Sequence, residues 1–159
     1  MKPKIKGQKG FTLIELMVAL TIFAIGLLSV ANMQIMSLRT NSVSDSLSTS
    51  SDLAQGILEE ILAWDPDRPE MQSSAVDVVW DFDPETSTVE SLLSIDSDGN
   101  LVSSATEGTF SATYSVSADY NGINELNRIV VTVTPAHGRH KPVTLVAFKS
   151  RGVPWRGNL

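Results

Sequence analysis

Hydrophobic and polar positions divide this chain into three parts with different patterns. From residue 11 to residue 38 the sequence is almost continuously apolar, and Glu15 is its only formally charged side chain. A helix of about 20 such residues crosses the hydrocarbon core of a bilayer. This stretch of 28 residues is longer than that. We therefore predict a membrane-spanning helix over residues 11–38.

The second part, residues 39–64, is amphipathic. Its apolar side chains recur mostly at intervals of three and four residues, which is helical spacing: Val43, Leu47, Ala54, Ile57, Leu58, Ile61 and Leu62. The pattern predicts that the helix continues out of the membrane and packs this stripe against a sheet. The serine-rich residues 42–51 leave an alternative open, in which Asp52 and Gln55 start a second helix as a capping box.

The third part, residues 65–159, begins at Asp65-Pro66, where the residue before proline is pushed out of the α region and ends the helix. From residue 66 to residue 108 the pattern is irregular, which favours a long connection with one or two edge strands. Strict polar and apolar alternation then predicts an antiparallel meander of three strands, with one face on the helix stripe: Phe110–Ala118, Ile129–Val133 and Val143–Ala147. The predicted fold class is α+β, a long N-terminal helix packed against a small antiparallel sheet.

Charge is segregated along the chain, although the formal net charge is only −6. Residues 45–125 contain 17 acidic side chains and one basic side chain, whereas residues 128–159 contain six basic side chains and no acid. Either the basic strands lie beside acidic loops of the same fold, or a positive edge meets an acidic partner. Six basic residues without a motif or an aromatic platform do not indicate nucleic-acid binding.

Four lysines precede the apolar run, at positions 2, 4, 6 and 9. A basic flank of this kind stays in the cytoplasm, which places the C-terminal bulk of the chain in the periplasm or exterior. An ordinary secretory signal is the alternative, but its cleavage site follows the apolar region. The small-residue pattern of such a site is poor around residues 24–32, so we expect the apolar segment to stay on the mature protein.

Catalytic and metal-binding signals are weak. The sequence shows no Gly-x-Ser-x-Gly elbow, and His137 and His140 fit a solvated turn. Asp96 and Asp98 precede Gly99 as at the start of a calcium loop, but the distal Glu of that pattern is absent. We interpret this stretch as a turn, with the two aspartates as weak metal candidates. These weak signals predict that the chain is not an enzyme and has no cofactor.

The residues Lys9-Gly10-Phe11-Thr12-Leu13-Ile14-Glu15 resemble the processing site of type IV pilins and of the pseudopilins of type II secretion. The resemblance implies that a prepilin peptidase removes the leader, residues 1–10, by cleaving between Gly10 and Phe11. It further implies N-methylation of Phe11 and a role for Glu15 in assembly. The implied partners are that peptidase and N-methyltransferase, other pilins or minor pilins, the inner-membrane assembly platform, and membrane lipid before assembly.

Two shorter stretches, Ala24–Leu28 and Arg128–Thr134, resemble the minor pilins called PilV and the similar GspI pseudopilins. This implies a minor subunit that takes part in assembly or initiation of a type IV pilus. It would be a single-pass inner-membrane protein first and a filament component later. A type II secretion pseudopilin is the alternative, and a stand-alone membrane-anchored binding domain is a third possibility.

Overall fold

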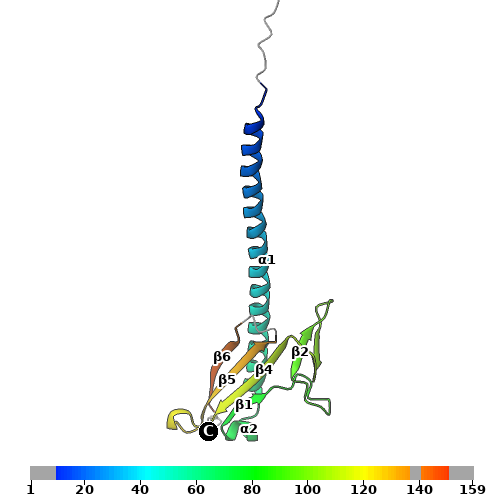
Figure 1. Cartoon of the computed structure of the whole chain (residues 1–159). Coiled ribbons are helices and arrows are strands. Elements are labelled where there is room, and N and C mark those ends of the chain that lie inside the picture. Colours follow the sequence, from blue (N-terminus) through cyan, green and yellow to red (C-terminus); the bar gives the residue numbers. More distant parts are fainter. Residues whose placement is uncertain (1–9, 137–140, 151–159) are drawn as a thin grey trace, which may run out of the picture. The chain divides into compact units, whose positions relative to one another are not determined.

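The computed structural model describes residues 10–136 and 141–150. The leader before Gly10, both histidines and Trp155 lie outside these residues. One long helix is followed by six antiparallel strands (Figure 1), which confirms the predicted α+β class. The chain divides into two compact units, residues 1–42 and residues 43–159, which we describe separately.

The long helix α1 is assigned without interruption from Leu13 to Ala63. The alternative of a second helix starting at Asp52 is therefore wrong. Serine has only a modest helix propensity deficit, and propensity is a weak prior that context overrides. The end of α1 is as predicted, just before Asp65-Pro66.

The sheet has the strand order β3-β2-β4-β5-β6, and β1 also pairs with β4. Its strands are β1 Ala75–Val79, β2 Leu92–Ile95, β3 Leu101–Ser104, β4 Phe110–Ser117, β5 Leu126–Pro135 and β6 Val143–Ser150. The short helices α2, Pro69–Gln72, and η1, Tyr120–Gly122, lie in connections. The meander β4-β5-β6 is confirmed, with Phe110 opposite Pro135 and Val133 opposite Val143.

The irregular region before the meander contains more strands than predicted. Residues 66–108 include three strands, whereas the sequence pattern predicts one or two. Two of them, β2 and β3, have four residues each and form a hairpin in which Leu92 pairs with Ser104 and Ile95 with Leu101. These strands are too short for a clear alternation, and Leu101 is exposed although it is apolar. Their position depends on pairing with β4, which the local sequence does not reveal.

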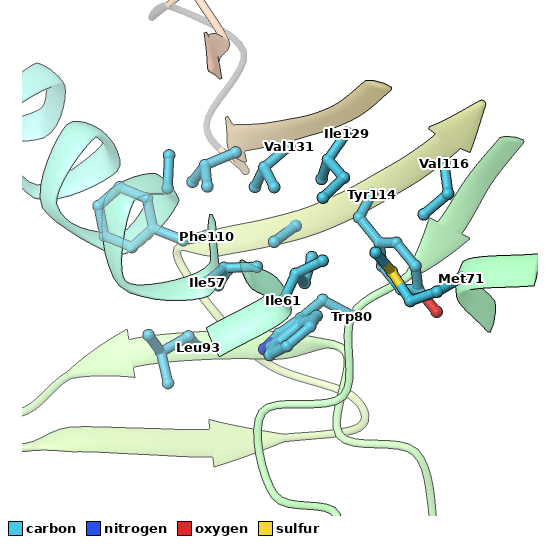
Figure 2. Close-up of a cluster of buried hydrophobic side chains, with 13 residues drawn as sticks. Ile57, Ile61, Met71, Trp80, Leu93, Phe110, Tyr114, Val116, Ile129 and Val131 are labelled. Atoms are coloured by element: carbon cyan, nitrogen blue, oxygen red, sulfur yellow. The ribbon is translucent and has the colours of Figure 1, made fainter. Parts of the chain in front are cut away.

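The core of residues 43–159 lies between α1 and the inner face of the sheet. Figure 2 shows Ile57 and Ile61 of the helix between strand side chains such as Val131 and the ring of Trp80. The inward residues of β4 and β5 are buried at alternate positions, as the meander predicts. The predicted helix stripe is buried only in part, since Val43 and Leu47 are each 39% exposed. Buried positions of α1 begin at Ser50, because only the later turns face the sheet.

Basic residues of the C-terminal strands make contacts other than ion pairs. Lys149 donates hydrogen bonds from Nζ to the carbonyl oxygens of Leu62, at 2.8 Å, and Trp64. Arg128 lies 5.6 Å from the ring centroid of Tyr120. Within residues 10–136 and 141–150 the one ion pair is Arg68 with Glu70. Direct pairing with acidic loops therefore does not neutralise the described basic strands.

Candidate processing and assembly segment

The start of α1 is determined by Thr12. Its hydroxyl oxygen accepts a hydrogen bond from the Glu15 amide at 3.4 Å, and its carbonyl accepts one from the Leu16 amide at 3.2 Å. Thr12 is thus the N-cap, and Glu15 occupies the third helical position, where its backbone amide donates to the Thr12 hydroxyl. The Thr-x-x-Glu spacing is the sequence signal that could have predicted this role of Thr12. Glu15 also lies where the helix dipole favours a negative charge.

Gly10 and Phe11 precede the helix in an exposed segment. A Cβ atom added to Gly10 would meet nothing within 4 Å, and Gly10 is not among the described residues with positive φ. The fold of this chain therefore gives no reason for glycine at this position. Phe11 is 86% exposed, so its backbone amide is accessible to another molecule. Any requirement for Gly10 would come from a partner that approaches the backbone.

The first half of α1 presents apolar side chains on all sides. Every residue from Leu13 to Ser42 is exposed, and none of its most apolar window is buried within the chain. By length and composition this helix can cross a membrane. Its hydroxyl groups donate within the helix, Thr21 to the Met17 carbonyl at 2.8 Å and Ser29 to the Ile25 carbonyl at 2.9 Å. These bonds satisfy polar groups that lipid could not, so the segment is consistent with membrane anchoring.

Asp96 and Asp98 lie in the turn of the β2-β3 hairpin. Asp96 Oδ1 accepts hydrogen bonds from the amides of Asp98, at 2.9 Å, and Asn100, at 2.8 Å. The hydrogen bonds from Asn100 are the main cause that lowers the pKa of Asp96 below its usual value. The carboxylate oxygens thus hold an Asx-type turn, in which Gly99 has a φ of +85°. In the described part of the chain no three Asp, Glu or His side chains gather as metal ligands.

Three aromatic side chains pack against one another just past the end of α1. The rings of Trp64 and Trp80 are stacked with centroids 6.0 Å apart, and Tyr114 meets both edge-on. The Arg68 guanidinium lies 4.3 Å from the Trp64 ring centroid. Burial raises the pKa of the Tyr114 hydroxyl, and the negative charge of Glu70 adds to this. The two tryptophans are therefore anchors of the core.

Comparison with known families identifies the N-terminal segment. The model of the prokaryotic N-terminal methylation motif matches residues 5–31, which include Gly10, Phe11, Glu15 and much of the apolar helix. Neither a curated protein nor a solved structure matches the chain significantly. The motif marks type IV pilin-like proteins and pseudopilins, which confirms the resemblance at that level.

The motif at residues 5–31 and the helix-then-sheet fold are consistent with a structural protein of the pilin-like or pseudopilin class. The motif implies processing by a prepilin peptidase and assembly with other pilins. It does not separate a minor pilin from a secretion pseudopilin, because both classes carry it.

Proposed function

We propose that this chain is a minor subunit of a type IV pilus, of the PilV kind, which takes part in assembly or initiation of the filament. One observation carries the proposal: the methylation motif leads into a helix whose apolar first half is wholly exposed. Such a surface needs lipid or other apolar helices around it. A type II secretion pseudopilin is the alternative, since the same motif and helix would serve it.

The proposed organisation follows the pattern of the sequence. Residues 1–10 are the leader, residues 11–38 the membrane and assembly helix, residues 39–64 its amphipathic continuation, and residues 65–159 the sheet domain. The four lysines keep the N-terminus in the cytoplasm, and the sheet domain faces the periplasm. Lipid covers the apolar helix of the unassembled subunit, and other pilins replace the lipid in the filament. The inner-membrane assembly platform mediates that transfer.

Cleavage between Gly10 and Phe11 creates the amino terminus that takes part in assembly. It removes four lysines and leaves a methylated α-amino group on Phe11, which carries a positive charge because the pKa of an α-amino group is about 7.7–8.0. In a filament of staggered helices, Glu15 of one subunit meets the amino terminus of a neighbour. Pairing offsets a burial cost that neither charge could bear alone.

Processing is the step that tests this proposal. We expect the mature protein to have lost residues 1–10 and to carry one methyl group on Phe11. Gly10→Val should stay in the membrane unprocessed, because the peptidase must approach the backbone closely at this residue. Gly26→Val is the matched control, since a Cβ there also meets nothing within 4 Å of the chain. Intact mass spectrometry measures both variants.

The control should be cleaved like the wild type. Loss of residues 1–10 from Gly10→Val would contradict the processing assignment, and an intact Met1 in the wild type would favour a stand-alone membrane protein. Comparison of sheared filaments with membranes then asks whether the mature protein enters a pilus. Co-purification with secretion pseudopilins instead would favour the alternative.

A further inference from the structure

A groove of about 600 Å³ opens between α1 and the β2-β3 hairpin, entirely within residues 43–159. Ile95 and Leu101 of the hairpin are 42% and 59% exposed, although both are apolar. A concave apolar surface of this kind marks a place where another molecule binds. We refer to it as the hairpin groove. Most of its lining residues are apolar, and they include Leu53, Ile57, Phe82, Leu93, Ile95 and Leu101.

The helix wall of the hairpin groove carries a glycine between two carboxylates. Asp52, Gly56 and Glu60 are spaced four residues apart, so they follow one another along one face of α1, and all three are exposed. Glycine is among the least favourable residues inside a helix, yet a Cβ atom at Gly56 would meet nothing within 4 Å. The packing of the described chain therefore does not require this glycine. Its effect is to keep the wall low, which lets a side chain of another molecule approach the helix backbone.

The charge of the hairpin groove selects its occupant. No lysine or arginine lines the groove in the part of the chain that the structure describes. Neither Asp52 nor Glu60 forms an ion pair with another described residue. An occupant that fits therefore combines apolar side chains with positive charge.

A surface with this composition lies on the outer face of β5 and β6. Phe148 is 54% exposed and lies opposite Arg128 in the strand register. Val146 is 46% exposed and lies opposite Val130. The Tyr120 ring contacts both the Phe148 ring, at a centroid distance of 5.5 Å, and the Arg128 guanidinium. Aromatic and arginine side chains are enriched at protein interfaces and supply much of their binding energy. We refer to these five residues as the β5-β6 patch.

The β5-β6 patch carries the charge that the hairpin groove lacks. Neither β5 nor β6 contains an acidic residue, and Arg128 forms no ion pair within the described part of the chain. The nearest acids in the sequence are Asp119 and Glu125, in the connection before β5. They take part in the fold of that connection, where Asp119 Oδ1 accepts a hydrogen bond from the Glu125 amide at 2.9 Å.

Groove and patch belong to opposite edges of one sheet. In the strand order, β3 and β2 lie at one end and β5 and β6 at the other. The groove is on the side of the sheet that α1 covers, whereas the patch residues of β5 alternate with the buried ones and face away from the core. One chain therefore cannot bring its own patch into its own groove.

We propose that the β5-β6 patch of one copy of this chain binds the hairpin groove of a second copy. Phe148 packs on the helix wall at Gly56, and Arg128 of the same patch lies beside Asp52 and Glu60. Because patch and groove are different surfaces, each copy can bind one neighbour through each of them, and such head-to-tail contacts build rings or filaments. The proposal goes beyond the proposed function, since it needs two copies side by side in a membrane but neither cleavage nor a pilus.

Cysteine cross-linking tests the contact in the full-length protein, which has no native cysteine. One variant carries Ser103→Cys in the groove together with Val146→Cys on the patch. A short bis-maleimide reagent is added to membranes, and denaturing electrophoresis separates the products. We expect dimers, trimers and larger species from the double variant, because a head-to-tail contact continues from copy to copy. Either single variant should stay monomeric.

A control pair keeps Ser103→Cys but replaces Val146→Cys by Thr134→Cys. Thr134 is exposed on the same face of β5, four residues from Val130 and so about 13 Å along the strand from the patch. The control pair should give several-fold less cross-linked product. Equal ladders from the two pairs would overturn the proposal. Abundant dimers from Ser103→Cys alone would overturn it as well, because they would place groove against groove.

Gly56→Leu tests the groove without weakening the helix. Leucine is a better helix former than glycine, so the variant should be at least as stable, yet its side chain fills the groove and should reduce the ladder at least about tenfold, as for an interface hot spot. Gln55→Leu is the matched control, because it adds the same side chain at an exposed neighbouring position that does not line the groove. Ladders of equal strength from these two variants would show that the groove stays empty.

Reversal of charge tests the polar part of the contact. Arg128→Glu should remove most of the ladder, and its combination with Asp52→Lys and Glu60→Lys in the same chain should restore it. Recovery cannot come from a variant that fails to fold, so its absence counts against the pairing. Cross-linking in Gly10→Val should give the full ladder, because the contact lies within residues 43–159. A ladder from a chain that is never cleaved would support this contact and contradict the proposed function, so the two proposals fail separately.

Discussion

Lys149 shows how one residue joins two elements that are far apart in the sequence. The last carbonyls of α1 have no partners within the helix, and no basic residue lies in its last turn. Lys149, on β6, supplies the missing donor to the carbonyls of Leu62 and Trp64. A positive charge here also complements the helix dipole. The contact therefore fastens the end of the edge strand to the end of the helix.

The first prediction concerns this contact. Lys149→Met keeps most of the length of the side chain but removes the donor, so it should lower the free energy of unfolding by about 1.5–3 kcal/mol, the range for a hydrogen bond to a charged group. Lys141→Met is the control, because Lys141 is exposed in the connection before β6. Urea unfolding followed by tryptophan fluorescence measures both variants. Equal unfolding midpoints for the two would show that the contact adds no stability.

At the scale of elements, α1 serves two environments with one backbone. Its first 30 residues, Leu13–Ser42, are exposed on every side, whereas from Ser50 onward one face is buried against the sheet. A helix suits both settings because it satisfies its own backbone hydrogen bonds in lipid and in a protein core. Along α1 the apolar side chains change from an almost continuous run to positions spaced three and four residues apart.

The second prediction concerns the charge at the start of α1. Glu15→Gln keeps the backbone amide that donates to the Thr12 hydroxyl, but it removes the charge. If Glu15 pairs with the amino terminus of a neighbour, Glu15→Gln should be inserted and cleaved normally yet be depleted from filaments at least about tenfold, the effect of losing roughly 1.4 kcal/mol. Immunoblots of sheared filaments and of membranes measure the distribution.

Thr12→Ala is the matched control for the capping role of Glu15. It removes the hydroxyl that accepts from the Glu15 amide but leaves the carboxylate in place. Normal incorporation of Thr12→Ala together with loss of Glu15→Gln would separate charge from capping. Wild-type incorporation of Glu15→Gln would refute the assembly role.

At the scale of the whole molecule, the division at residue 42 leads to a prediction about folding. Residues 43–159 contain the complete sheet and the buried helix face, so they should fold without the apolar half of α1. We expect a soluble protein with mixed helix and strand in far-ultraviolet circular dichroism and one cooperative thermal transition. A random-coil spectrum would show that the core depends on the rest of the chain.

Much of this fold and of its N-terminal segment can be predicted from sequence, because the signals are local. The apolar run, the alternation of β4 to β6 and the Gly-Phe-Thr-Leu-Ile-Glu stretch are each contained within a few turns or one strand. The start of α1 at Thr12 is equally local. The hairpin β2-β3 was not predicted, because its short strands alternate weakly and are placed by pairing with β4.

The sequence by itself determined that this chain has a long apolar helix, a processing motif and an antiparallel meander. Only the tertiary structure decided which residues distant in sequence meet. Asn127, whose Nδ2 donates to the Met71 carbonyl at 2.6 Å in the core, reads as a turn residue in the sequence. The contact of Lys149 with the end of α1 likewise joins residues distant in sequence. Period, motif and the Thr12 cap depend on neighbours along the chain, whereas the partner at the end of α1 and the buried polar contacts depend on how the elements pack.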